Sequence, residues 1–174
     1  PLHPAELSEG AASLLPQQER PAVVWTLDLD SDAAVRSTDV RRARIISRAQ
    51  LAYDEVQRQL DDGAADELLI GLRDVGLGRQ EQERQRGGVD LPVPEQVVTN
   101  DDGEWRLSFR APLPVEGWNA QMSLMTGMAA ADLMLAAGTG ILRTMPPPAP
   151  ADLARVRRTA KALGLTWPQD GSYA

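Results

Sequence analysis

The chain has 174 residues, a hydrophobic fraction of 43% and a formal net charge of −7. This length is typical of one domain or part of one, and the hydrophobic fraction is sufficient for a core. The chain contains no cysteine, which excludes a disulfide framework or a thiolate zinc site and fits the reducing cytoplasm as its location. Because phosphate contacts require Lys and Arg, the negative charge leaves two alternatives. Either the chain is scaffold and further segments complete a basic channel, or it does not bind nucleic acid.

A membrane partner is not expected. The longest apolar stretch, residues 122–137, is interrupted by polar residues and is too short to cross a bilayer. The first residues lack the basic and apolar regions of a signal peptide, and the sequence does not begin with Met. We therefore expect a piece of a longer protein, with residues 1–174 forming one partial domain, and the sequence does not indicate an oligomeric state.

A short helix and two strands are predicted in the first part of the chain. The helix covers residues 4–15 and ends before a proline, and residues 20–30 alternate in polarity as a strand does. One face of this strand carries its large apolar side chains, Val23, Trp25, Leu27 and Leu29. Residues 35–47 predict a second strand, antiparallel to the first across a turn at residues 31–33.

Two helices are predicted next. The first covers residues 53–60 and ends at an Asp-Asp-Gly turn; the second covers residues 64–86 and contains three glycines that weaken its predicted continuity. The apolar stripe of the second helix consists of Leu68, Leu69, Leu72, Val75 and Leu77. The polar remainder, GRQEQERQRGG, predicts a solvated helix end, with an RNA-facing arm as the alternative.

A hairpin and a long helix follow. Residues 96–100 and 104–110 predict the two strands of the hairpin, because Asp102-Gly103 supplies the positive φ angles of a tight turn. Residues 114–137 predict a helix that is apolar on most of its circumference and therefore buried. Two rows of side chains carry this pattern: Trp118, Met122, Met125, Ala129 and Leu133 in one, and Leu124, Met128, Ala131 and Leu135 in the other.

The last part of the chain predicts a strand at residues 141–144, a rigid proline corner at residues 145–150 and a basic amphipathic helix at residues 151–163. Residues 169–174 predict a loose tail. No internal repeat or interdomain linker is present in the sequence.

The most informative stretch is residues 43–56, ARIISRAQLAYDEV. It places the aromatic ring of Tyr53 at a junction between a strand and a helix, with Arg42, Arg44 and Arg48 close by in the sequence. An aromatic ring can stack on any nucleobase, and arginines can contact phosphates. The alternative is a tyrosine that packs as part of an amphipathic helix.

Five segments in a fixed order resemble the RNB family, the catalytic module of ribonuclease II and ribonuclease R exoribonucleases. The resemblance is greatest to a bacterial branch with Trp-Asn-Ala-Gln on the central helix. The segments are PLHPAELSEGAASLLP with RPAVVWTLDLD, then SRAQLAYDEVQ, RGGVDLPVPE, WNAQMSLMTGMAAADLML and ILRTMPPPAPADLARVRRTAKALGL. The resemblance implies an α/β (α+β) fold in which a twisted, mainly antiparallel sheet is packed by a long buried helix.

The same resemblance implies a magnesium-dependent hydrolase that removes nucleotides from the 3′ end of single-stranded RNA. Clustered aspartates of the family hold Mg²⁺, which activates water and stabilises the leaving oxygen. That cluster lies upstream of the segment matched by the start of this chain, and the family's catalytic arginine lies downstream of the last matched helix. No catalytic residue or metal ligand is therefore assigned to this chain, which alone is predicted to be inactive.

Three residues are assigned to RNA binding by the resemblance. Tyr53 matches a family tyrosine that lies against RNA near the 3′ end, with plain packing as the alternative. Asn119 and Gln121 lie where the family carries paired glutamates that contact the ribose 2′-hydroxyl. Amides can also bind a hydroxyl but carry no charge. The alternative for both amides is that they satisfy local backbone groups.

Other constellations predict no site. Asp28, Asp30 and Asp32 have the first spacing of a calcium loop, but Ala33 and Asp39 stand where that loop requires Gly and Glu. His3 is the only histidine and lies at the start of the chain. The alternative to an exoribonuclease segment is a non-catalytic RNB-like module that binds RNA or another protein.

Overall fold

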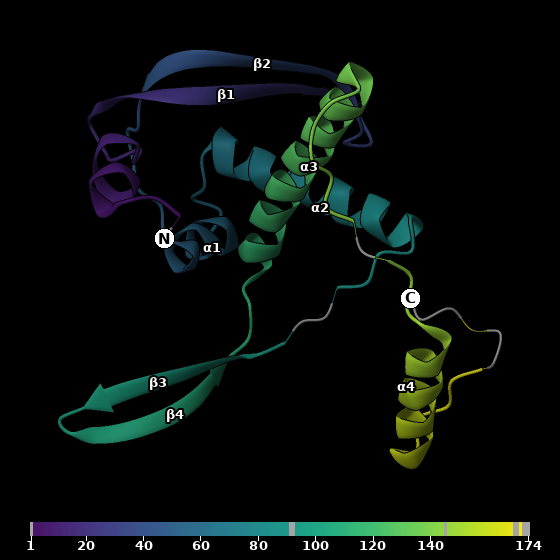
Figure 1. Ribbon diagram of the computed structural model, residues 1–174. Helices are drawn as coiled ribbons and strands as arrows, with labels where there is room; N and C mark the ends of the chain where they lie inside the picture. Colours follow the sequence, from purple (N-terminus) through teal and green to yellow (C-terminus); the bar gives the residue numbers. More distant parts are fainter. Residues whose placement is uncertain (1, 91–92, 145, 169–170, 172–174) are drawn as a thin grey trace. The chain divides into compact units, whose positions relative to one another are not determined.

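The computed structural model describes residues 2–90, 93–144, 146–168 and 171. Figure 1 traces its elements in chain order. They are a π-helical turn at Glu6–Ala11, β1 (Glu19–Leu29), β2 (Val35–Ile46), α1 (Tyr53–Asp61), α2 (Glu67–Gln85), β3 (Glu95–Asp101), β4 (Glu104–Arg110), α3 (Pro114–Ala137) and α4 (Pro150–Ala162). The helix predicted at residues 4–15 is thus reduced to a short turn.

The chain divides into two compact units, Pro1–Asp132 and Leu133–Ala174. The described strands of the first unit form two separate antiparallel pairs, β1 with β2 and β3 with β4. The antiparallel pairing predicted from the sequence is confirmed. A single continuous sheet is not formed by the described residues, because no backbone ladder joins one pair to the other.

The β1–β2 hairpin is held at its turn by one aspartate. Asp30 Oδ1 accepts hydrogen bonds from the backbone N–H groups of Asp32 (3.0 Å) and Ala34 (2.9 Å). This allows Ala33 to adopt a φ of 59° although it is not glycine. Along β1 the side chain of Val23 is 59% exposed, whereas Trp25 is half-buried.

The core of the first unit is the junction of three helices. Val56 of α1, Leu69 of α2, and Val115 and Trp118 of α3 form one buried cluster. The carboxylate of Asp66 caps α2 by accepting the N–H of Leu69 at 2.9 Å. Figure 1 shows that helices α2 and α3 cross. They approach each other closely at Gly76 of α2 and Trp118 of α3.

The buried face of α2 differs from the predicted stripe. Leu68 is 72% exposed and Leu77 is 50% exposed, whereas Leu69, Gly76 and Arg79 are buried. The three buried positions follow the helical period of 3.6 residues, and the two exposed leucines lie away from that line. The prediction of a solvated polar end is therefore wrong at Arg79, which is only 3% exposed.

Helix α3 has the predicted bounds but is buried on one face only. The buried positions are Val115, Trp118, Gln121, Met125 and Ala129. The second predicted row is more open: Leu124 is 42% exposed and Leu135 is 62% exposed. The expectation that most of the circumference is buried is wrong for the described residues.

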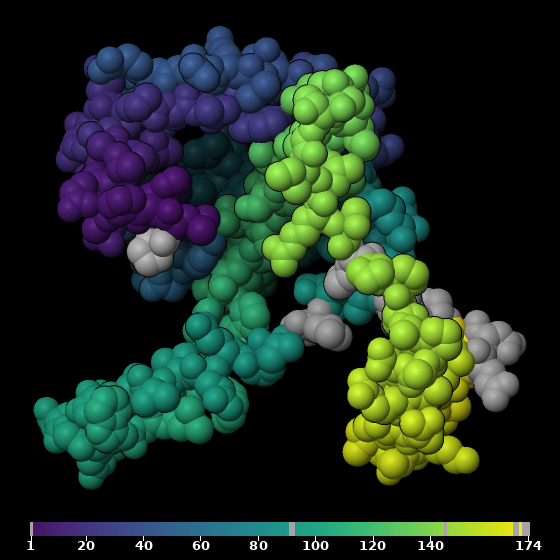
Figure 2. Space-filling view, in the orientation of Figure 1, coloured from purple at the N-terminus to yellow at the C-terminus, as the bar shows by residue number. Residues whose placement is uncertain are grey.

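The β3–β4 hairpin turns at Asp102 and Gly103, whose φ angles of 53° and 92° confirm the predicted tight turn. Both strands are exposed along nearly their whole length, and Figure 2 shows their atoms as a narrow, elongated group in teal. Three large side chains of β4 alternate onto one face, namely Trp105, Leu107 and Phe109.

In the second unit α4 confirms the predicted helix. The predicted strand at residues 141–144 is not formed, and Ile141 is 88% exposed. An extended segment needs a neighbouring strand to pair its backbone groups, and the described residues provide none here. The first residue of the proline corner, Met145, and all of the predicted tail except Gly171 lie outside the described residues. No helix of the described chain is long and apolar enough to cross a membrane.

Candidate nucleic-acid interface

Tyr53 is the first residue of α1, and its side chain is 46% exposed. The preceding residue, Ala52, has extended backbone angles and provides no side-chain cap. The chain therefore changes from extended to helical directly before the ring, as the sequence predicted. An aromatic ring that is half open at the end of a helix presents a surface on which a base can stack.

Asn119 of α3 contacts this tyrosine directly. Its Nδ2 donates a hydrogen bond to Tyr53 Oη at 2.9 Å, across a separation of 66 residues. Both side chains are exposed at this point. The bond holds the hydroxyl end of the ring against the first turns of α3.

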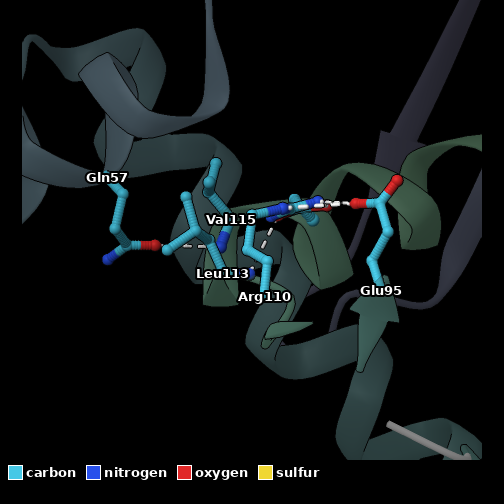
Figure 3. Close-up of polar contacts among 6 residues, drawn as sticks. Gln57, Glu95, Arg110, Leu113 and Val115 are labelled. Atoms are coloured by element: carbon cyan, nitrogen blue, oxygen red, sulfur yellow. Dashed lines mark hydrogen bonds and ion pairs between the residues drawn. The ribbon is translucent and has the colours of Figure 1, made fainter. Parts of the chain in front are cut away.

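Gln57 of α1 makes a second connection between α1 and α3. Its Oε1 accepts the backbone N–H of Val115 at 3.0 Å, and its Nε2 donates to Asp61 at 2.9 Å. Figure 3 shows the Gln57 side chain directed at the start of α3. Because Gln57 is only 9% exposed, this bond is protected from water and fixes α3 relative to Tyr53.

Gln121 lies apart from that pair. It is 6% exposed, and its Nε2 donates to Glu83 Oε2 of α2 at 2.6 Å. Its Oε1 is buried and has no hydrogen-bond partner among the described residues. The same amide lines a cavity of about 470 Å³, together with Glu83 and Gly117. The structure therefore brings Tyr53 and Asn119 together and places Gln121 at the α2–α3 contact.

Arg110, Glu95 and Glu116 form an ion-pair cluster where the β3–β4 hairpin ends and α3 begins. We call it the Arg110 cluster, and it was not predicted. Arg110 Nη2 pairs with Glu95 at 2.7 Å, and Nη1 pairs with Glu116 of α3 (Figure 3). The hydrogen bond from Arg110 lowers the pKa of Glu116, as does the backbone N–H of Leu113, which Glu116 accepts at 2.9 Å. Glu116 also raises the pKa of Arg110. A glutamate in the first turn of a helix often accepts the backbone N–H of the residue three positions before it. The spacing of Leu113 and Glu116 is therefore the sequence signal that could have indicated this bond.

The arginines that precede Tyr53 are exposed. Arg44 forms an ion pair with Glu19 of the neighbouring strand. Arg42 and Arg48 are exposed, and within the described part of the chain their side chains make no hydrogen bond or ion pair. Cations of this kind remain available to phosphates.

The aspartates at the β1–β2 turn serve that turn. Hydrogen bonds from Ala34 above all, and then from Asp32, lower the pKa of Asp30, whose Oδ2 also accepts Arg36 Nε at 3.2 Å. Asp28 accepts the hydroxyl of Ser37. Among the residues with described positions, no three His, Cys, Asp or Glu side chains are grouped as a metal site requires. These residues therefore do not fit a two-magnesium centre.

Comparison with known proteins identifies the family of the chain. The sequence profile of the RNB domain matches residues 1–171. The chain belongs to the RNB domain family. Ribonuclease R of Mycoplasma pneumoniae is 31% identical over 118 residues, which are 63% of this chain and 16% of that protein. Ribonuclease R of Mycoplasma genitalium is 28% identical over 109 residues, or 59% of this chain and 15% of that protein. The chain thus spans less than a fifth of the length of these relatives.

Solved structures show the same fold. The apo form of M. genitalium RNase R aligns with a TM-score of 0.85 at 24% identity, over 97% of this RNB chain and 28% of that chain. The same enzyme with ribose-methylated single-stranded RNA gives the same values, and its complex with double-stranded RNA gives 0.82 at 23% identity, over 97% and 32%. This similarity confirms the α+β class.

Proposed function

We propose that this RNB chain is part of a 3′–5′ exoribonuclease that hydrolyses single-stranded RNA to nucleotides, and that the segment supplies scaffold and RNA guidance. The observation that carries the proposal is the half-exposed ring of Tyr53, fixed by Asn119 at 2.9 Å. A ring held in this way loses little side-chain freedom when a base stacks on it, so more of the stacking energy contributes to affinity.

Asn119 and Gln121 take different parts in this proposal. Asn119 lies beside the ring, and its carbonyl Oδ1 remains an acceptor for a ribose hydroxyl. The buried Oε1 of Gln121 has no hydrogen-bond partner among the described residues, and Gln121 is one of the residues that line the 470 Å³ cavity. A hydroxyl that enters this cavity would satisfy a buried acceptor, and such satisfaction favours binding.

Magnesium belongs to the proposal only for the intact protein. Two bound Mg²⁺ ions would supply the activation of water and the stabilisation of the leaving oxygen. The described residues of this chain do not group the carboxylates that this requires. The ligands would therefore come from other parts of the intact protein, in the cytoplasm where we expect it to act.

A second candidate function follows from the same observation. Without a carboxylate cluster among its described residues, the segment could serve a non-catalytic RNB-like protein that binds RNA or another protein. Hydrolysis separates the two candidates. The intact protein should release nucleotides from the 3′ end of a 5′-labelled oligoadenylate only with added Mg²⁺, whereas the non-catalytic candidate would bind the oligonucleotide and leave its length unchanged.

The guidance role is tested by binding of fluorescein-labelled oligoadenylate to the intact protein that contains this chain, without added Mg²⁺. Tyr53→Ala should weaken binding by about 5-fold to 150-fold, because one base stack contributes about 1–3 kcal/mol. Tyr53→Phe retains the ring but loses the bond from Asn119, so it should weaken binding by only a few fold. Circular dichroism of both variants checks that the fold is intact. Equal affinity of Tyr53→Ala and the unmodified chain would refute the role of the ring.

A further inference from the structure

The charges of the chain are unevenly distributed between its two units. The whole chain has a formal net charge of −7. Residues 133–174 nevertheless carry five arginines and lysines against two aspartates, so the second unit is basic and the first strongly acidic. Surface potential depends on the local charges more than on the total. The second unit is therefore the part of the chain with the net charge that attracts an anionic polymer.

Most of these cations lie on one helix and gather at one cavity. The cavity has a volume of about 390 Å³ and is lined by the C-terminal half of α4 and the segment after it. Its lining residues are Arg157, Arg158, Lys161, Leu165, Thr166 and Trp167. We call this set the α4 basic cavity. On a helix, residues three and four positions apart are neighbours, so Lys161 lies beside both arginines.

Two cations of the α4 basic cavity are free to bind a ligand. Arg158 and Lys161 are exposed, and within the described part of the chain neither makes a hydrogen bond or ion pair. Arg155 of the same helix differs, because it pairs with Asp152 at 3.0 Å. The helix dipole favours cations near the C-terminus of a helix, which could explain why these side chains lie on α4. It does not explain why they line a cavity that has an aromatic wall.

The aromatic wall of the cavity is Trp167, which is half-buried. The guanidinium of Arg157 lies over its ring, 5.4 Å from the centroid. This cation–π contact holds the indole in place. An anchored indole next to free cations combines the two groups by which proteins bind single-stranded nucleic acid, namely a stacking surface for bases and charges for phosphates.

We propose that the α4 basic cavity is a second contact site for single-stranded RNA, in addition to the one at Tyr53. Trp167 stacks on a base, and Arg158 and Lys161 contact the neighbouring phosphates. This inference rests on the proposed function, because it takes RNA as the ligand of the chain. It deepens that proposal by assigning phosphate contacts to a unit in which the sequence pattern alone predicted only a basic amphipathic helix.

The test compares two charge reversals in the intact protein that contains this chain, without added Mg²⁺ and with fluorescein-labelled oligoadenylate as the probe. The variant pair Arg158→Glu/Lys161→Glu removes the free cations of the cavity. The control pair Arg41→Glu/Arg143→Glu changes the net charge equally, at exposed residues outside it. We expect the cavity pair to weaken binding about tenfold and the control pair to weaken it much less. Loss of two phosphate contacts should also reduce the salt dependence of log affinity by about 1.4.

The stacking half of the inference is tested by Trp167→Ala against Trp167→Phe. The alanine variant should bind at least about fivefold more weakly, and the phenylalanine variant should retain most of the affinity. Equal loss in both charge pairs would overturn the inference, because only net charge would then matter. Full affinity in the cavity pair would also overturn it and would favour an acidic protein segment as the ligand. If Tyr53→Ala still weakens binding in that case, the proposed function stands and only the second site fails.

Discussion

Asn119 Nδ2 donates a hydrogen bond to Tyr53 Oη at 2.9 Å, and this bond connects the first turn of α1 to the first turns of α3. The two residues stand 66 positions apart. Asn119 is thus a positioning residue for the aromatic ring. The buried hydrogen bond between Gln57 and Val115 connects the same two helices.

This relationship predicts coupling between the two side chains. Tyr53→Phe and Asn119→Ala each remove the bond, so each should weaken oligoadenylate binding by a few fold, in line with the ~0.5–1.5 kcal/mol of one hydrogen bond. The loss of affinity in the double variant should be smaller than the sum of the two single losses, because both variants remove the same bond. Titration of all four proteins measures the coupling. Additive losses would show that Asn119 acts independently of the ring.

Two glycines of α2 should respond in opposite directions to alanine. A Cβ at Gly76 would lie 2.6 Å from Cγ of Trp118, whereas a Cβ at Gly71 meets nothing within 4 Å. Gly76→Ala should lower the free energy of unfolding by about 1–2 kcal/mol, since overpacking outweighs the gain in helix propensity. Gly71→Ala should raise it by up to about 1 kcal/mol. Urea denaturation measures both, and equal shifts would contradict the close approach of α2 and α3.

Arg79 should contribute to stability through the space that its buried side chain fills as well as through its hydrogen bonds. Its Nη1 donates to Ala33 O at 3.3 Å and to Gln82 Oε1 at 2.9 Å, and burial lowers the pKa of its guanidinium. Arg79→Ala should destabilise the chain by about 2 kcal/mol, because it leaves a cavity and unpaired acceptors. Arg79→Met fills the space without a buried charge and should cost less. An equal loss of stability in both variants, measured in urea, would contradict this division.

The pair of Arg110 and Glu116 should make stability depend on acid pH. Arg110 holds the pKa of Glu116 below its ordinary value of 4.5 in the folded state. The resulting stabilisation is present above pH 4.5 and is lost as the pH falls through the folded-state pKa. Glu116→Gln cannot lose a charge, so its urea midpoint should fall less between pH 7 and pH 3 than that of the unmodified chain. Identical pH profiles would exclude a role of this pair.

Most helices, strands and turns of the fold could be predicted from local sequence. Helix α3 and the turn at Asp102-Gly103 agree with their predictions because an apolar run and an Asp-Gly pair act over a few residues. The buried face of α2 was predicted wrongly, since the composition of the helix favours its leucines and the observed face passes through Gly76 and Arg79. That face is set by contacts with Trp118 and Ala33, which lie far away in the sequence.

The candidate site likewise contains features that local sequence predicts and features that depend on contacts between distant residues. The exposure of Tyr53 at a helix start could be predicted from its position after an extended segment. The separation of Gln121 from Asn119 could also have been predicted, because residues two positions apart on a helix point about 200° from each other. The contact of Tyr53 with Asn119 could not, because it joins two helices that are distant in the sequence. The Arg110 cluster was missed for the same reason, since it joins a hairpin to a helix.

The most direct test of RNA guidance is ultraviolet cross-linking of oligoadenylate to the intact protein that contains this chain, without added Mg²⁺, followed by tryptic digestion and mass spectrometry. Trypsin cleaves after Arg48 and Arg58, so Tyr53 is the only aromatic residue of its peptide. We predict an RNA adduct on that peptide, located at Tyr53 and reduced in Asn119→Ala. RNA adducts confined to other peptides, with none on residues 49–58, would contradict the account.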